Sequence, residues 1–206
     1  ALDETRPTSG ARYIANSHLL EDIYAFNDFS HVGNNPGLMK KRQITRTKKP
    51  YIITEYAGHM YPTKKFDSEQ HRVNHAIRHL NVMDRIAADD KVAGGFGWCM
   101  FDYNTHKDFG SGDAVCYHGV LDMFRIEKFA AYAYASQKTD EPVMHILSAI
   151  NIGEYPAALL KNVYVMTNCD YIKVYRNNDY LKTFYPNRKK YKYIKHPPII
   201  IDDFFG

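Results

Sequence analysis

The sequence predicts an α/β fold that continues into a smaller all-β region. A β-branched run at residues 51–55 is followed by an amphipathic helical pattern and by a second apolar run at residues 92–101. Strand, helix and strand within about 50 residues form a βαβ unit, whose two strands are parallel. From about residue 140 the chain changes to short β-type runs separated by Asn and Asp turn signals.

Composition supports a packed core and excludes some functions. The 206 residues are 45% hydrophobic and 14% aromatic, which suffices for one large domain or two small ones. The net charge of +4 is a mild imbalance that does not by itself indicate a nucleic-acid partner. No apolar run reaches the roughly 18 residues that a membrane-spanning helix needs. We therefore expect no nucleic-acid and no membrane partner.

The N-terminal elements are predicted from apolar runs. Residues 18–29 end in a mixed apolar stretch that indicates a strand, and residues 36–42 are compatible with a helix. Residues 51–55, after Pro50, indicate a buried strand.

The next segment predicts a long helix. Asp67 or Ser68 is expected to cap it, and Gln70, three residues after Asp67, completes a capping-box pattern. One face then holds Val73, Ala76, Ile77, Leu80, Asp84 and Ala87. The apolar residues 92–101 return as a second strand, and residues 125–137 predict another helix.

The C-terminal third predicts a small antiparallel β domain. Residues 163–166 and 171–175 read as strands between turn signals. The chain then has too few strands for a complete sandwich, so we expect a piece that is truncated at both ends. The expected division lies between residues 1–140 and 141–206.

Glu55 is the first candidate for chemistry, because it ends the run Tyr51–Glu55. In barrels of alternating strands and helices, the carboxyl ends of the strands hold the active site. A strand-end carboxylate alone is more often structural. The residues around Glu55 therefore decide its interpretation.

Three motifs resemble glycoside hydrolase family 2, the group of β-galactosidases and β-glucuronidases. Residues 2–7 (LDETRP) are similar to the segment that leads into the fifth barrel strand. Residues 53–57 (ITEYA), with Met60, are similar to the seventh-strand motif, whose glutamate is the nucleophile. Residues 95–98 (GFGW), with Asp102, resemble the eighth strand, whose tryptophan helps form the sugar subsite.

This resemblance covers most of the chain and implies its architecture. Residues 1–140 would be the C-terminal part of a (β/α)8 TIM barrel. Residues 141–206 would begin an immunoglobulin-like β-sandwich, as in many bacterial members, and leave it incomplete. The compartment stays open between the bacterial periplasm and the cytoplasm.

The resemblance also implies retaining hydrolysis of a β-glycoside. Two carboxyl groups about 5–5.5 Å apart flank the bond that breaks in such enzymes. Glu55 would attack the anomeric carbon, and Trp98 would offer a ring face to the sugar. This chemistry requires no cofactor.

Two departures from the family pattern bear on activity. The family's acid/base glutamate follows an asparagine, and no Asn-Glu pair occurs in the chain, so we expect the chain alone to be inactive. Related enzymes place a tyrosine two residues after an asparagine, near the nucleophile. Here Phe29 stands two residues after Asn27, which leaves Tyr24 or Tyr56 as alternatives.

The substrate is expected to be a β-linked oligosaccharide or glycoside, with a galactoside as first choice. The family's Asn-x-Lys motif for uronic acids is absent from residues 116–120. The histidine that β-galactosidases place three residues after the nucleophile stands one position later, at His59. The residues expected to contact sugar, besides Trp98, are His59, Asn27, Asp102, His106 and Lys107, with Asp108 as a further loop candidate.

Other readings stay open beside the hydrolase. His71, His75 and His79 recur every four residues, a spacing that a helical metal site would also show. They fall opposite the apolar residues of the helix, Val73, Ile77 and Leu80, which favours a solvated face. Cys99 is expected to pack rather than react. The alternative function is a non-catalytic carbohydrate-binding or structural fragment. The uncovered edges of a partial barrel predict association with itself or with missing upstream segments.

Overall fold

The computed structural model describes residues 3–31, 37–58, 61–106, 112, 114–138, 140–150 and 162–204. Three helices and ten strands are assigned within these ranges. In chain order they are β1 (Ser9–Gly10), β2 (Ile23–Asn27), α1 (Lys41–Ile44), β3 (Tyr51–Glu55), α2 (Glu69–Ala87), β4 (Tyr103–Asn104), β5 (Val115–Cys116), α3 (Phe129–Ala135), β6 (Met144–Ile146), β7 (Val163–Thr167), β8 (Ile172–Arg176), β9 (Asp179–Phe184) and β10 (Ile199–Ile201).

A small parallel sheet forms the N-terminal half. Its strands lie in the order β1-β2-β3, and both pairs are parallel. The segment after α2 extends the sheet beyond β3 through parallel bridges from Ile53 to Gly95 and from Ala57 to Trp98. Four parallel segments therefore follow one another in chain order across this sheet.

The predicted strand at residues 92–101 is wrong as a regular strand, because only isolated bridges form there. Glycines explain the difference, since they weaken a strand but allow other groups to approach its backbone. A Cβ atom at Gly95 would lie 2.5 Å from Cδ1 of Ile86, on α2. The segment therefore lacks the regular hydrogen bonds of a strand, and it packs closely against α2.

The long predicted helix is confirmed as α2. Ser68 is its N-cap, and its hydroxyl accepts a hydrogen bond from the backbone N–H of His71 (3.3 Å). Asp67 is not the cap, because its carboxylate accepts from the backbone N–H of Lys64 (2.7 Å).

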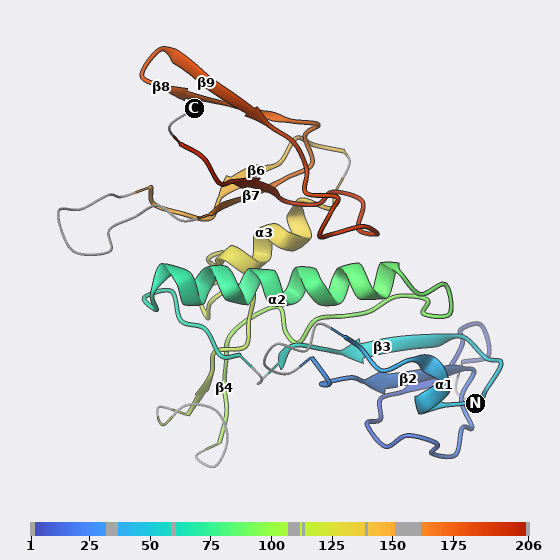
Figure 1. Ribbon diagram of the computed structural model, residues 1–206. Helices are drawn as coiled ribbons and strands as arrows, with labels where there is room; N and C mark the ends of the chain where they lie inside the picture. The colour runs from blue at the N-terminus through green and yellow to red at the C-terminus, as the bar shows by residue number, and fades with distance from the viewer. Residues whose placement is uncertain are drawn as a thin grey trace.

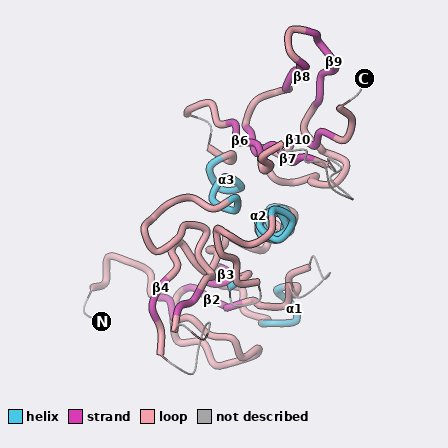
Figure 2. Tube along the Cα trace, turned by 90° about the vertical axis from the view of Figure 1, so that its left-hand side faces the viewer, coloured by secondary structure: helices cyan, strands magenta, loops and turns pink. Residues whose placement is uncertain are grey.

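Both sides of α2 are covered, as Figure 1 shows, with the parallel sheet on one side and the C-terminal strands on the other. Val82 packs into a cluster with Tyr24, Phe26 and Ile53 of the sheet. Figure 2 views α2 end-on, with α3 beside it. The second cluster joins α2, α3 and the C-terminal region, and it contains Val73, Ala76, Leu80, Ala130, Ala133, Leu147, Met166, Tyr191 and Ile194.

This double coverage overturns the expectation of a solvated histidine face. His75 is 3% exposed and His79 is fully buried. His79 Nδ1 lies 2.8 Å from the hydroxyl of Tyr134, and its Nε2 lies 3.3 Å from Nε2 of His75. The histidines belong to the core because the second layer on α2 comes from distant parts of the chain.

The C-terminal strands are antiparallel, as predicted. β7 lies between β6 and β10, and β8 and β9 form a separate hairpin. A third apolar cluster fills the space between them, with Val163, Val165, Phe184, Ile199 and Ile201 buried.

Two predicted helices are shorter than expected. In the range 36–42 a helix begins only at Lys41, and Pro36 lies outside the described residues. In the range 125–137, α3 begins at Phe129, because Arg125 adopts a left-handed backbone (φ 67°) in the preceding turn. None of the helices found in the described ranges is long and apolar enough to cross a membrane.

Candidate functional site

The candidate site lies where three parallel segments end side by side. Glu55 is the last residue of β3, is partly buried, and is paired in register with Asn27 at the end of β2. The backbone N–H of Asp28 donates to the carbonyl of Glu55 (2.9 Å). The backbone N–H of Trp98 donates to the carbonyl of Tyr56 (2.9 Å). Main-chain hydrogen bonds therefore place Asn27, Glu55 and Trp98 on neighbouring segments at one end of the sheet.

A tight turn directly after Glu55 brings the neighbouring side chains close. Ala57 (φ 69°) and Gly58 (φ 41°) both adopt left-handed backbones. A Cβ atom at Gly58 would lie 3.0 Å from Cε1 of Phe29 and 3.6 Å from Cδ1 of Trp98. The turn therefore lies between the Phe29 ring and the indole.

Trp98 is 37% exposed, so it is not a simple core residue. Its Nε1–H donates to the hydroxyl of Tyr103 (3.3 Å), and the two rings meet edge to face at 88°. Burial raises the pKa of the Tyr103 hydroxyl to about 12, so this group remains protonated at neutral pH. Tyr103 thus fixes the nitrogen edge of the indole, and part of the Trp98 side chain remains exposed to solvent.

Asn27 is fixed next to Glu55 through its amide. The hydroxyl of Thr54 donates to Oδ1 of Asn27 (2.7 Å), and the backbone N–H of Asn27 donates to the carbonyl of Arg12 (2.6 Å).

Asp102, which precedes Tyr103 in the chain, forms a buried ion pair with Lys128. Nζ of Lys128 and the backbone N–H of Gly119 both donate to Oδ1 of Asp102, at 2.6 Å and 2.8 Å. Burial raises the pKa of the Asp102 carboxyl and lowers the pKa of the Lys128 ammonium, and the hydrogen bond between them opposes both shifts. Only 6% of Asp102 is exposed, and its contacts link the segment after Trp98 to Gly119 and Lys128.

Known proteins give the context for this geometry. No protein-family model matches the chain. A β-galactosidase of Thermoanaerobacterium thermosulfurigenes is 50% identical over 206 residues, covering 98% of this chain and 29% of the relative. The chain is homologous to one segment of that β-galactosidase. It spans about 29% of the length of that curated relative.

Solved structures of β-glucuronidases share the fold. The Bacteroides uniformis β-glucuronidase 2, solved with a covalently bound cyclophellitol-6-carboxylate aziridine, gives a TM-score of 0.72 at 18% identity over 99% of this chain and 26% of that one. A β-glucuronidase from glycoside hydrolase family 2 gives a TM-score of 0.57 at 21% identity over 89% and 19% of the two chains. These likenesses support the α/β fold class.

The remaining predicted site residues are placed only in part. His106 is exposed in the segment after β4. His59, Lys107 and Asp108 lie outside the described residues. The hydroxyls offered as alternatives beside Glu55 have other partners: Tyr56 bonds to Tyr134 (2.8 Å) and Tyr24 to Ser17 (3.3 Å).

Two residues near the site were not predicted. Tyr103 has a local signal, because it is an aromatic residue directly after Asp102 in a family motif. Lys128 has none, because it lies 26 residues from its partner Asp102 and looks like an ordinary charge at a helix start. Cys99 is partly buried, its thiol donates to the carbonyl of Phe101 (3.0 Å), and burial raises the pKa of this thiol to about 11.

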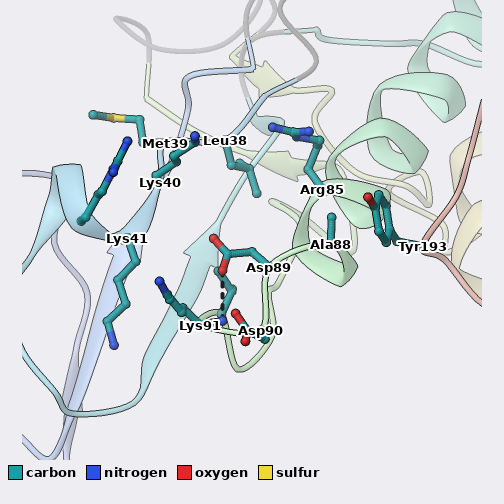
Figure 3. A pocket seen from close by; sticks show the side chains of 12 residues that line it. Leu38, Met39, Lys40, Lys41, Arg85, Ala88, Asp89, Asp90, Lys91 and Tyr193 are labelled. Atoms are coloured by element: carbon teal, nitrogen blue, oxygen red, sulfur yellow. Dashed lines mark hydrogen bonds between the residues drawn. The ribbon is translucent and has the colours of Figure 1, made fainter.

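No cluster of metal-ligating side chains occurs in the described part of the chain, including α2. A surface pocket of about 420 Å³, shown in Figure 3, lies at the opposite end of the sheet from Glu55. The pocket is placed there by Val92, one of its lining residues. The next residue, Ala93, donates its backbone N–H to the carbonyl of Tyr51, the first residue of β3. Its lining includes Lys40, Lys41, Arg42, Arg85, Asp89, Asp90 and Lys91. We therefore place the candidate site at the carboxyl end of β3, not in this pocket.

Proposed function

We propose that this chain is part of a retaining β-glycosidase with Glu55 as its nucleophile. The observation that carries the proposal is the position of Glu55 at the carboxyl end of β3, between Asn27 on β2 and the partly exposed Trp98. In barrels of this class the strand carboxyl ends hold the active site. The homology to a β-galactosidase supports the same reaction class.

The proposed architecture is the C-terminal part of a (β/α)8 barrel over residues 1–140, followed by the start of an immunoglobulin-like sandwich. Its support is the chain-ordered parallel series β1, β2, β3 and residues 95–98, with α2 after β3 and α3 after residues 95–98. The antiparallel strands β6 to β10 support the second part.

In the proposed mechanism, the Glu55 carboxylate attacks the anomeric carbon as the bond to the leaving oxygen breaks. A second carboxyl group, on a segment outside this chain, protonates that oxygen and then removes a proton from the water that releases the sugar. Trp98 offers its open ring surface to the C–H face of the sugar. Asn27, beside Glu55, would contact sugar hydroxyls, and His59, His106 and Lys107 are proposed as further sugar contacts.

A β-galactoside is the proposed substrate. The relative with 50% identity is named a β-galactosidase, whereas the β-glucuronidase structures are below 25% identity and bear only on the fold. The lack of an Asn-x-Lys motif at residues 116–120 agrees with this choice.

The test is covalent labelling with 2-deoxy-2-fluoro-β-galactosyl fluoride, followed by peptide mapping. Fluoride leaves without a general acid, and the 2-fluoro group slows release of the sugar, so labelling does not depend on the upstream carboxyl group. We expect an adduct on Glu55 that is absent from Glu55→Gln.

The outcomes separate three alternatives. Labelling only in a longer protein that includes the upstream Asn-Glu would mean that the rest of the barrel completes the site. Sugar binding without an adduct in that longer protein would favour a non-catalytic binding fragment. If the longer protein shows no sugar binding and no adduct, the galactosidase proposal is refuted.

A further inference from the structure

We propose that Lys128 is a positioning residue that fixes the two walls of the sugar site, an inference that rests on the proposed glycosidase function. One wall is the segment that follows Glu55, and the other is the segment that follows Trp98. Lys128 itself lies at the N-cap of α3, in a different part of the chain.

The contacts of the ammonium group carry this inference. Nζ of Lys128 donates to the backbone carbonyl of Thr63 (2.6 Å) and to Oδ1 of Asp102 (2.6 Å). Thr63 belongs to the segment between Glu55 and α2, and Asp102 directly precedes Tyr103, which binds the Trp98 indole. A single group therefore joins both segments.

The surrounding backbone makes the connection tighter. The N–H of Gly119 donates to the same Oδ1 of Asp102 (2.8 Å), and the N–H of Thr63 donates to the carbonyl of Tyr117 (2.9 Å). Residues 117–119 therefore bridge the same two segments through the main chain. The ammonium supplies the central contact of this group.

Burial makes the contact strong and hard to replace. The side chains of Lys128 and Asp102 are 3% and 2% exposed, so water does not compete for their hydrogen bonds. Removing one partner of such a pair leaves the other charge uncompensated. Arginine would present a larger planar fork in place of a compact ammonium, so it cannot serve the two acceptors in the same way.

A second lysine–aspartate ion pair provides a matched control. Lys65 and Asp122 join the segment before α2 to the turn before α3, with Nζ and Oδ2 3.7 Å apart. Their side chains are 42% and 16% exposed, so this pair is weakened by solvent. Lys65→Met also removes one lysine charge, but it leaves the buried contact of Lys128 intact.

The experiment compares Lys128→Met with Lys65→Met in the full-length protein that contains this chain. We expect Lys128→Met to raise the KM for an aryl β-galactoside, and the inhibition constant of a galactose-like competitive inhibitor, by about 10- to 100-fold, because small displacements of binding groups have effects of this size. Lys65→Met is expected to leave both constants within about twofold, as a surface pair contributes little.

The double variant Lys128→Met/Asp102→Asn separates positioning from stability. It removes the uncompensated carboxylate, so thermal stability should recover relative to Lys128→Met. The raised KM should remain, because the bond to Thr63 is still missing. A double variant with wild-type KM would overturn the proposal, and so would a folded Lys128→Met with wild-type constants.

A readout that needs no activity keeps this inference distinct from the proposed function. Hydrogen exchange at residues 61–67 and 99–104 should accelerate in Lys128→Met and stay unchanged in Lys65→Met. Accelerated exchange with no glycosidase activity in the wild type would refute the proposed function alone. Unchanged exchange would refute the role of Lys128. If Lys128→Met does not fold, Asp102→Asn tests one half of the connection through exchange at residues 99–104, because it weakens the contact to Asp102 and leaves the bond to Thr63.

Discussion

The hydroxyl oxygens of Tyr56 and Tyr134 lie 2.8 Å apart in the core, although 78 positions separate the two residues in the chain. Tyr56 directly follows Glu55, and Tyr134 belongs to α3. The Tyr134 hydroxyl also contacts Nδ1 of His79 on α2, at 2.8 Å. The residue next to the proposed nucleophile is thus connected to both helices behind the sheet.

Replacing Tyr134 by phenylalanine should lower the free energy of unfolding by about 1–3 kcal/mol. The change leaves the Tyr56 hydroxyl and the His79 imidazole buried, each without its present partner. Urea unfolding followed by circular dichroism would measure the loss. Tyr132→Phe, which removes a hydroxyl from the same helix outside this network, is the control and should change stability little. Equal stability of both variants would contradict the role given to the network.

Stability should fall as the pH is lowered below about 6.5. Burial lowers the pKa of His79 to about 3 and places that of His75 well below its ordinary value, whereas an unfolded imidazole titrates near 6.5. The unfolded state therefore binds protons first, so the contribution is complete above pH 6.5 and decreases between about pH 6.5 and 3.

Thermal unfolding across this pH range would test the assignment. His79→Gln should flatten the decline, and His18→Gln, at an exposed position, should leave it unchanged. A decline with the same slope in His79→Gln would assign the effect to other groups.

Asp84 should matter more for its oxygen than for its charge. Its Oδ1 accepts from the backbone N–H groups of Tyr193 (2.8 Å) and Ile194 (3.0 Å). Asp84→Ala leaves both groups unpaired and should cost about 2–4 kcal/mol of the free energy of unfolding, whereas Asp84→Asn keeps an acceptor oxygen and should cost less. Chemical denaturation of the two variants makes the comparison. A larger loss for Asp84→Asn than for Asp84→Ala would show that the charge dominates.

Gly58→Ala should impair the proposed site more than the fold. The left-handed φ of 41° and the contact with Phe29 resist a Cβ atom, which should shift the turn after Glu55 and lower kcat/KM by about tenfold or more. Steady-state kinetics on the full-length protein would measure this. Gly112→Ala, with no atom within 4 Å of the added carbon, is the matched control. Wild-type kcat/KM in Gly58→Ala would show that the turn tolerates the shift.

Local signals predicted β3 and α2 well, because β-branched residues and a helical apolar period both act over a few residues. They failed at residues 92–101, because the side chain of Ile86, on α2, leaves no room for a Cβ atom at Gly95. They also failed at His75 and His79, whose burial depends on residues such as Tyr134, far along the chain. Periodicity alone cannot report a second layer that packs on a helix from elsewhere.

In the candidate site, too, some residues could be predicted from local sequence and others could not. Glu55 and Trp98 were located by short motifs, and the structure brings their segments together at one sheet end. Lys128 could not be found from the sequence, because the partners that define it, Thr63 and Asp102, lie in separate segments. Residues that hold a site in place leave weaker local signals than residues that face it.

One helix, α2, closes two apolar clusters at once, one toward the sheet and one toward α3 and the C-terminal strands. The sheet and the C-terminal region therefore both pack on the same helix. A chimera that exchanged only residues 141–206 with those of a related enzyme would set a foreign surface against Val73, Ala76 and Leu80. A joint ahead of Ser68 would instead separate Val82 from Tyr24, Phe26 and Ile53, so successful recombination would need α2 to keep both of its neighbours.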